Sequence, residues 1–556
     1  MKLKFQTTVF GQLVRIVSHG RLLRYPDEID SSLWKKAVDE QVPQLKQVHE
    51  HTQDTEHPND AEEGSKKNLE PFELQSNVPQ DNIVAKDEPD TNVMVVNWYG
   101  PDDPENPQNW PENYKHLIFL QLCFLNFAVY IASSIYVPGE PDLMEGFGVS
   151  KIVATLGLSL FTIGYGMGPM LWSPLSEMPK LGRSAIFFWT LFAFIILQLP
   201  VGFAPNVSVF FFFRWLTGFC GSPCLSTGGG VITDIYAPTK VPYCLCIWAA
   251  AGVLGPILGP LIGGYLAPSV GWRWTIWTFT CICSLVLVVM FFLFPETSAA
   301  NILYKRAKRL RKATGIQHLR SQSEIESAHY TPKDNLRLVG KAFTLTFMEP
   351  VVLLINLFAG LLYGVLFTWF ESFPLVFGDI YHFNPGQQGL VFIGILVFSI
   401  IALPLFLLWI KLRLVPAMTS GNFKPEMVLP PTTIGAAALP ICLFWFGWTS
   451  REDLHWILPI VGSGFFAIGI ITLFNSLYMY LGIVYAQHAA SIFAGAALFR
   501  ASFGATFPLF APSLFARLGI GPGNSLLGGI AVLFFPIPFV FYRYGERLRG
   551  WKCANQ

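Results

Sequence analysis

Twelve apolar stretches, each near the length of a membrane-crossing helix, restrict the fold of this chain more than any other feature. A helix needs about 20 apolar residues to cross roughly 30 Å of hydrocarbon. The stretches occupy residues 116–138, 152–174, 184–204, 207–233, 242–267, 273–294, 350–377, 388–410, 429–449, 455–483, 489–515 and 525–543. With 52% hydrophobic and 13% charged residues, the 556-residue chain is too apolar for soluble domains. We therefore predict an all-α membrane protein with twelve transmembrane helices in two six-helix halves.

Basic residues gather on one side of the predicted bundle. They follow the sixth stretch and end the chain, at Lys305, Arg306, Lys308, Arg309, Arg311, Lys312, Arg543, Arg547, Arg549 and Lys552. Cytoplasmic loops of membrane proteins carry an excess of Lys and Arg. We therefore expect both termini and the central loop to be cytoplasmic.

The apolar stretches divide the chain into five regions. They are, in order, a mostly disordered cytoplasmic tail, a six-helix bundle, a cytoplasmic central loop, a second six-helix bundle and a short cytoplasmic tail, at 1–114, 115–295, 296–347, 348–544 and 545–556. Within the first tail, residues 5–17 have the pattern of a basic amphipathic helix on the inner membrane face. An unstructured tail is the equal alternative.

Several classes of function are disfavoured. A net charge of +1 argues against a nucleic-acid partner, and without a GxxxxGK[ST] phosphate loop direct use of ATP is not expected. The nine cysteines lack the spacing of a disulfide framework or metal site, so we expect no metal and no cofactor. No spacing of nucleophile and base indicates an enzyme. A membrane enzyme and a transport-inactive sensor are kept as alternatives, and we expect a monomer.

A pair of prolines recurs at matching places in the two halves. Pro256 and Pro260 lie four residues apart in the fifth stretch, and Pro508 and Pro512 lie four apart in the eleventh. Proline-interrupted helices at corresponding positions of two repeats are typical of alternating-access carriers. Coincidence is the other explanation.

The fifth stretch contains GVLGPILGPLIGG at 252–264. Its glycines and prolines are Gly252, Gly255, Pro256, Gly259, Pro260, Gly263 and Gly264. A small residue at every fourth position from Ala251 to Gly263 forms a strip along which another backbone can approach closely. We expect this strip to rock against a helix of the other half, with ordinary small-residue packing as the alternative.

These glycines and prolines, read as GPxxGPxxGG, resemble the antiporter signature of the major facilitator superfamily, and specifically its fungal drug:proton antiporters with twelve spans. Other motifs agree in order along nearly the whole chain: DDPENPQNW (102–110), PLSE (174–177), WRWTIW (272–277), FPET (294–297), MEP (348–350) and YRYGERLR (542–549). Within that family the chain is most similar to the yeast benomyl and fluconazole resistance pumps. The resemblance implies export of drugs in exchange for protons by alternating access, at the plasma membrane.

The resemblance also implies a cytoplasmic latch at Glu177, Gly182 and Arg183, which holds the halves together in the outward-facing state. Two features depart from the family pattern. Four residues separate Glu177 from Gly182 where the family has two, and YLGIVY at 480–485 lacks an Asp that many relatives carry. Solvated loop charges are the alternative for the latch residues.

Charges within the apolar stretches are few, and each costs at least about 2 to 3 kcal/mol there. The resemblance gives Arg214 the role of coupling transport to protons. Arg500 is a second coupling candidate or a structural bridge. Glu371 either titrates or reaches the outer water, and Asp234 is either a coupling residue or an interfacial charge at a helix end.

The substrate class is inferred from the side chains available. Several buried carboxylates would be needed to bind a polycation, and the apolar stretches offer one or two. Aromatic side chains are abundant, and the candidates for the lining of a site are Trp215, Tyr363, Phe367, Trp369, Phe370 and Tyr478. We expect uncharged, amphiphilic drugs such as azoles and benomyl-like compounds. The alternative is export of a native metabolite, for example a polyamine or a lipid-like compound, with drugs as incidental cargo.

Overall fold

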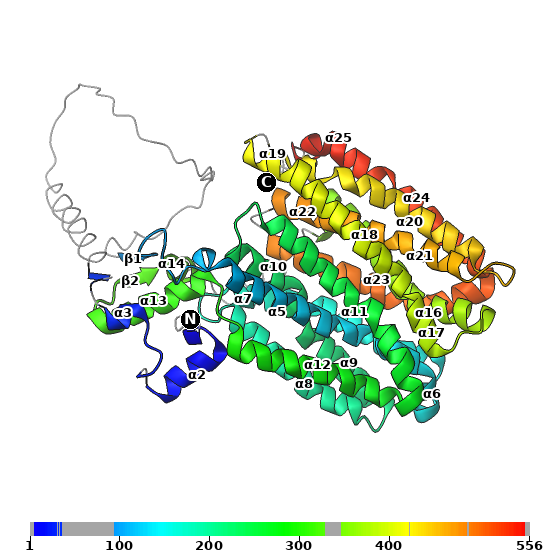
Figure 1. Ribbon diagram of the computed structural model, residues 1–556, viewed down its shortest axis with the longest axis horizontal. Helices are drawn as coiled ribbons and strands as arrows, with labels where there is room; N and C mark the ends of the chain where they lie inside the picture. Colours follow the sequence, from blue (N-terminus) through cyan, green and yellow to red (C-terminus); the bar gives the residue numbers. More distant parts are fainter. Residues whose placement is uncertain are drawn as a thin grey trace.

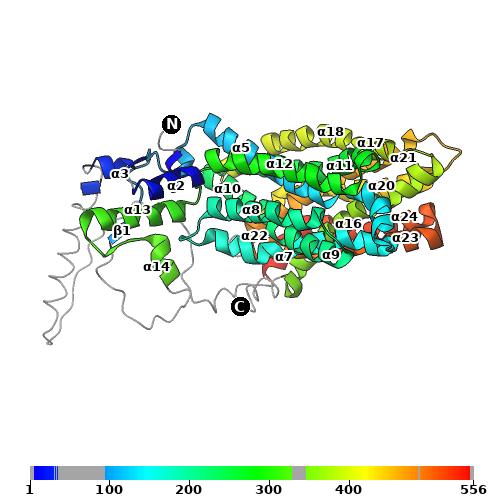
Figure 2. The same cartoon turned by 90° about the horizontal axis from the view of Figure 1, so that it is seen from below.

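The chain forms an elongated bundle of long helices (Figures 1 and 2). The computed structural model describes residues 5–19, 21–30, 32, 34–35, 94–328, 346–421, 423–485 and 489–550. Helix α13 (Ala299–Thr314) lies beyond one end of the bundle and α6 (Glu140–Phe147) lies at the other. We call these the α13 end and the α6 end.

Most of the bundle consists of two groups of helices that follow each other in sequence. The first group is α5 (Glu112–Tyr130), α7 (Lys151–Glu177), α8 (Arg183–Gly202), α9 (Val207–Gly221), α10 (Pro223–Ile235), α11 (Val241–Val270) and α12 (Trp272–Leu293). The second is α16 (Pro350–Phe373), α17 (Pro385–Val391), α18 (Ile393–Trp409), α20 (Pro430–Thr449), α21 (Ile457–Gly469), α22 (Asn475–Val484), α23 (Ala489–Leu518), α24 (Ile520–Phe534) and α25 (Pro536–Gly550). Figure 1 shows the first group in cyan and green and the second in yellow to red.

The predicted spans agree with these helices at eleven places. In the described part of the chain, eleven helices are long and apolar enough to cross a membrane, and each overlaps one predicted span. The remaining span, 207–233, is divided into α9 and α10. The break falls at Ser222, directly before Pro223, which has no N–H to continue the hydrogen-bond ladder of α9.

The first span is also irregular. Helix α5 ends at Tyr130 and is followed by two short 3₁₀ turns, η2 (Ile131–Ser133) and η3 (Val137–Gly139), before α6 begins. Backbone carbonyls released from helical hydrogen bonding inside a membrane must find other donors. The carbonyl of Ala132 is one of them, and its donor is described below.

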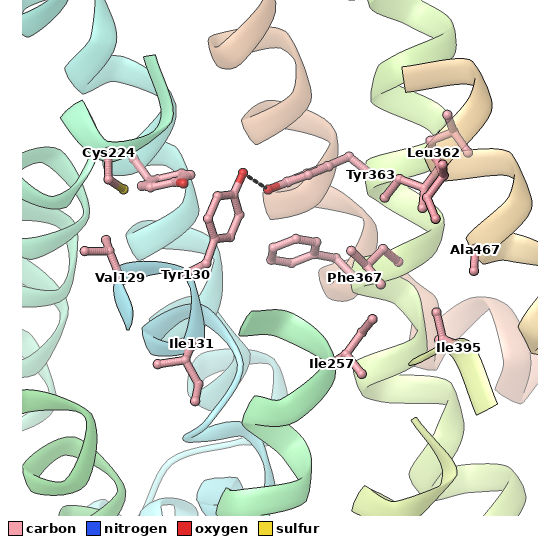
Figure 3. Packing of buried hydrophobic residues seen from close by; sticks show 14 of the residues in the cluster. Val129, Tyr130, Ile131, Cys224, Ile257, Leu362, Tyr363, Phe367, Ile395 and Ala467 are labelled. Carbon is pink, nitrogen blue, oxygen red and sulfur yellow. Dashed lines mark hydrogen bonds between the residues drawn. The ribbon is translucent and has the colours of Figure 1, made fainter. Parts of the chain in front are cut away.

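Helices α7 and α23 form one of the two main contacts between the halves. The Ser159 hydroxyl donates to the Ala505 carbonyl oxygen at 2.6 Å. A side chain added at Gly166 would overlap the methyl group of Ala501, so the two backbones lie unusually close. A hydrogen bond of 2.7 Å from the Tyr363 hydroxyl to the Tyr130 hydroxyl also joins the halves nearby (Figure 3).

The glycine strip of α11 packs against its own half, contrary to our expectation. Side chains added at Gly255, Gly259 and Gly263 would overlap backbone and side-chain atoms of residues 130–138 at the end of the first span. The reason is the irregular backbone after α5, which has room to approach only where α11 has no side chains.

The contact of α11 with the other half uses different atoms of the same motif. A side chain at Gly264 would overlap the Pro385 carbonyl at the start of α17, and one at Gly389 would overlap the Pro260 carbonyl. The neighbouring helix α18 also packs on α11. The paired prolines therefore lie in α11 and α23, both of which contact the opposite half.

The α13 end carries a small cap outside the bundle (Figure 2). It contains α2 (Val9–Val17), α3 (Pro26–Ile29), α13, α14 (Gln322–Ala328) and a parallel pair of strands, β1 (Met94–Val96) and β2 (Leu319–Ser321), with Met94 opposite Leu319. Helix α2 agrees with the amphipathic-helix alternative for residues 5–17, and its Phe10 ring packs on Phe291 and Phe292 of α12.

Residues 94–110 are folded onto α13, although we predicted disorder for most of 1–114. Arg306 is only 1% exposed and lies 2.7 Å from Asp103 and 3.1 Å from Glu105. Burial would raise the pKa of Asp103, but the hydrogen bond and charge of Arg306 outweigh it and lower that pKa. The expectation of disorder otherwise falls mainly on residues 36–93, which lie outside the described part.

Replacing Gly259 by Leu tests the contact between α11 and the first span. Leucine is favoured in lipid, so the variant should insert normally. Its side chain would collide with Ser134 and Ile135, and such overpacking costs about 1 to 3 kcal/mol. We expect a lower midpoint of thermal unfolding in detergent and loss of the transport that the sequence predicts.

Gly529→Leu is the matched control, because a side chain at Gly529 of α24 would meet no atom within 4 Å. The control should keep the parental melting curve. A Gly259→Leu protein that melts and transports like the parent would mean that the glycine is not needed for close approach.

Candidate functional site

A cavity of about 810 Å³ lies between the two halves. Its walls come from α5, α10 and α11 of the first half and from α16, α18, α22 and α23 of the second. Most of the lining is aliphatic or aromatic. The polar side chains are Gln108, Asn126, Tyr130, Ser226, Thr233, Tyr236, Trp248, Tyr363, Ser399, Asn475, Tyr478 and Arg500. The cavity thus has the form of a site for a small apolar molecule that bears a few polar groups.

The cavity extends towards the α13 end of the bundle. Gln108, next to the cap, and Pro238, between α10 and α11, contribute to its wall. Towards the α6 end the halves are in contact, through Gly264 with Pro385 and through the ring of Tyr265 against Gly386. The two ends of the bundle therefore differ: the halves are separated by the cavity on one side and closed on the other.

Two of the six predicted aromatic lining residues, Tyr363 and Tyr478, line the cavity. The other four lie elsewhere. Trp369 packs inside the second half against Phe446 and Phe466, and Phe370 packs against Phe392.

Phe367 stacks on Tyr363 but is not part of the wall, and neither is Trp215, which stacks on Phe219 within α9. Residue type alone could not separate these roles, because aromatic side chains fill protein cores and line ligand sites alike.

Several lining residues were not predicted. Asn126 and Tyr130 come from α5, and Trp248 comes from α11. Trp248 lies four residues before Gly252, so helical spacing places it on the same face as the start of the glycine motif. That spacing was the available signal for Trp248, whereas nothing in the sequence marks Tyr130 as the hydroxyl that pairs with Tyr363.

Arg500, predicted as a coupling residue or a structural bridge, is the only charged residue of the cavity wall among the residues that the structure describes. It is 8% exposed and belongs to α23. Its guanidinium lies 4.8 Å from the centre of the Phe474 ring and 5.1 Å from that of Tyr478. Within the described residues it forms no ion pair, so the structure gives no support to a bridge.

Arg214 is fully buried inside the first half. Its Nη1 donates to the Ala132 carbonyl at 3.1 Å, and its Nε donates to the Gly157 carbonyl at 3.2 Å. The rings of Tyr136 and Phe161 lie 4.6 and 4.7 Å from the guanidinium carbon. Arg214 is thus the donor for a carbonyl freed where the first span unwinds, and its charge is compensated by backbone dipoles and aromatic faces.

Glu371 lies where the two halves close on each other. It is 2% exposed on α16, and its carboxylate is 3.2 Å from Lys151 Nζ and 3.1 Å from the Thr155 hydroxyl, both on α7. The same hydroxyl is 3.4 Å from the carboxylate of Glu140, which is also buried. Two carboxylates from opposite halves therefore meet at one threonine.

Glu140 was not predicted as a site residue. Its position directly after the predicted first span, 116–138, is typical of an acid in a short, solvated loop, but the 3₁₀ turns after α5 carry it into the protein. Arg214 approaches Glu140 through Tyr136, whose ring lies 4.6 Å from the guanidinium carbon and which precedes Glu140 by four residues. Glu371, Glu140 and Lys151 thus form a group of charges, with Arg214 close to it.

Asp234 does not belong to this group. Its carboxylate lies 2.6 Å from Arg183 Nε, between the last turn of α10 and the first turn of α8. The backbone N–H of Arg183 donates to Glu296 at 3.0 Å, and Gly182 has a φ of +78° close to the same carboxylate. These contacts all lie within the first half.

Glu177, predicted to act in a latch with Arg183, is exposed and forms no hydrogen bond or ion pair with the residues that the structure describes. Asp234 takes that place because Arg183 begins α8 and faces the end of α10. For the part of the chain described here, no group of three His, Cys, Asp or Glu side chains could hold a metal ion.

Comparisons with known proteins agree with this architecture. Residues 122–508 match the family model described as Major Facilitator Superfamily. The chain is 34% identical over 553 residues to the "Cycloheximide resistance protein" of Candida maltosa, covering 97% of each chain. It is 37% identical over 470 residues to "Fluconazole resistance protein 1" of Saccharomyces cerevisiae, covering 82% of this chain and 84% of that protein.

Among solved structures, the proton:xylose symporter XylE bound to 6-bromo-6-deoxy-D-glucose superposes with a TM-score of 0.56. The superposition covers 78% of this chain and 96% of that one at 15% identity. At this level of identity the likeness concerns the fold.

Proposed function

Because the chain belongs to the major facilitator superfamily of transporters, we propose that it exports uncharged, amphiphilic drugs from the cytoplasm in exchange for protons. The observation that carries this proposal is the apolar cavity between the halves, closed at one end of the bundle and extending towards the other. The names of the relatives, which refer to resistance to cycloheximide and fluconazole, support a toxic small molecule as cargo.

The cavity fits the first half of an export cycle. The basic residues of the central loop predict that the α13 end faces the cytoplasm, and the family resemblance implies the plasma membrane as the location. In that orientation the cavity extends towards the cytoplasm and the α6 end is closed towards the outside. A drug would enter from the cytoplasm or the inner leaflet, and rocking of the halves would then release it outside.

The Glu140–Glu371 pair is our candidate for the proton site. Two carboxylates near one hydroxyl repel each other when both are charged, and a proton on either removes that repulsion. Lys151 lies beside Glu371 with a partly exposed side chain, which gives the pair a neighbour that reaches water. Opening of the α6 end would separate the two acids and expose them to external protons.

Arg214 would act on this pair without carrying a proton itself. A guanidinium stays charged at physiological pH. Its positive charge favours the deprotonated form of a nearby acid, and the guanidinium lies over the ring of Tyr136, four residues before Glu140. Asp234 would hold Arg183 at the α13 end through their ion pair. It would have no direct part in proton transfer.

The alternative function is export of a native metabolite. The lining of the cavity restricts which metabolites could bind. A polyamine needs carboxylates to replace its water, and the described wall of the cavity contains no Asp or Glu. A lipid-like metabolite remains compatible with the apolar wall.

The test of the proposed function is uptake into inside-out vesicles under an imposed pH gradient. The panel should contain fluconazole, cycloheximide, spermidine and a lysolipid. We expect uptake of the first two only when the vesicle lumen is acidic, with loss of uptake when a protonophore collapses the gradient. Uptake of spermidine alone, or uptake that ignores the gradient, would contradict the proposal.

Glu371→Gln tests the proton site, because the amide holds the neutral form permanently. We expect drug binding to the purified protein to survive, while pH-driven uptake falls at least about a hundredfold, the scale of a lost proton-transfer group. Glu452→Gln is the control, since Glu452 is exposed in the loop between α20 and α21. Equal loss of binding and uptake would indicate a structural role for Glu371.

Arg214→Ala tests the coupling role of the buried guanidinium. Removal of a buried charge makes insertion easier, so the variant should reach the membrane. We expect weak efflux with little response to external pH, measured with a fluorescent substrate in cells and corrected for surface abundance.

Arg214→Lys keeps the charge but not the forked geometry that serves two carbonyls. It should retain partial efflux with a displaced pH profile. If Arg214→Ala pumps at the parental rate with the parental profile, Arg214 is a structural charge only.

A further inference from the structure

Arg500 is a buried cation whose terminal nitrogens are free to bind a ligand. Its Nε donates to the Ala496 carbonyl of its own helix at 3.4 Å, and neither Nη atom has a hydrogen-bond partner among the described residues. A guanidinium has five N–H donors, and leaving the four on its Nη atoms unpaired in an apolar cavity costs free energy. A ligand with an acceptor oxygen would satisfy them.

Two further donors of the cavity wall are also without partners. The Tyr478 hydroxyl and the Trp248 Nε1–H are buried and form no hydrogen bond within the described part of the chain. Tyr478 lies beside Arg500, whereas the indole of Trp248, on α11 of the opposite half, packs its Nε1 edge against Gly228 of α10. Tyr478 therefore carries the unpaired donor that lies next to Arg500.

The same wall lacks any group that would bind a cation by charge. Its described residues include Arg500 but no Asp or Glu. Aromatic rings attract cations, but the guanidinium already lies over the rings of Phe474 and Tyr478. An organic cation in this cavity would meet a positive charge with no compensating carboxylate.

We propose that Arg500, with Tyr478, forms a recognition site for a hydrogen-bond acceptor, so that the transporter favours amphiphilic compounds that bear an acceptor atom, such as a carbonyl or carboxylate oxygen, and rejects organic cations. This inference rests on the proposed function only in taking the cavity as the binding site of the exported compound. In this proposal Arg500 binds the substrate and does not couple transport to protons. The aromatic part of the ligand would lie against the apolar wall, and its oxygen would face the guanidinium.

The test uses three fluorescent probes that differ in one group. Each has a pyrene ring on a four-carbon tail, which ends in a carboxylate (pyrenebutyrate), a carboxamide (pyrenebutyramide) or an amine (pyrenebutylamine). Binding to the purified full-length protein is measured by fluorescence anisotropy. We expect the carboxylate and the amide to bind about tenfold or more tightly than the amine, since hydrogen bonds to charged groups are among the stronger ones.

Arg500→Gln should weaken binding of the carboxylate about tenfold or more while weakening that of the amine little or not at all. Arg517→Gln is the matched control, because Arg517 is an exposed arginine of the same helix and does not line the cavity. If Arg500→Gln does not fold, Tyr478→Phe is a second test, because it keeps the ring and removes the unpaired hydroxyl donor beside Arg500. It should lower the affinity for the carboxylate and the amide but not for the amine.

Equal binding of all three probes, or an equal effect of Arg500→Gln on all of them, would overturn this inference. The binding measurements are separate from transport. If the probes bind in the expected order and none is taken up by vesicles under a pH gradient, the proposed export function fails while the recognition site stands. If fluconazole and cycloheximide are exported but the probes bind without this order, the recognition site fails while the proposed export function stands.

Discussion

The first half is organised around a permanent positive charge that is fully buried. Arg214 is held by the carbonyl oxygens of Ala132 and Gly157 and by two aromatic rings. The first span can unwind after Tyr130 because Arg214 donates a hydrogen bond to a carbonyl that no longer accepts one within the helix. That unwinding brings Glu140 inside the protein, where it meets Glu371 of the other half.

The contacts between the halves connect the cavity to this charged group. The Tyr130–Tyr363 hydrogen bond (Figure 3) borders the cavity. The Thr155–Glu371 contact lies at the closed end. Tyr130 and Tyr363 also belong to the cavity wall. Any rocking that opens the α6 end must break the Thr155–Glu371 contact, so movement around the ligand and hydration of the acids are mechanically linked.

The buried arginines have different surroundings, and this difference separates their roles. Arg214 has its hydrogen bonds largely supplied by the backbone, and Arg306 of the cap is paired with two carboxylates. Arg500 has one backbone hydrogen bond, from its Nε to Ala496, and no carboxylate partner among the described residues, yet it lines the cavity. A charge buried without a partner is costly, and a ligand that supplies an acceptor recovers part of that cost.

The sequence by itself determined where the membrane helices lie, because each depends only on the hydrophobicity of its own segment. It also identified Arg214, Glu371 and Arg500 as unusual, since an ionised side chain in an apolar stretch is visible without a structure. Only the tertiary structure decided which residues the charged side chains pair with. Arg183 pairs with Asp234 rather than Glu177.

The glycine strip of α11 faces its own half, and Trp369 belongs to the core and not to the cavity wall. Glu140 and Glu371 meet across the boundary between the halves, far apart in the chain. Spacing along one helix cannot predict these outcomes, because they depend on which faces of two different helices pack together and on how each helix bends where its backbone hydrogen bonds are broken.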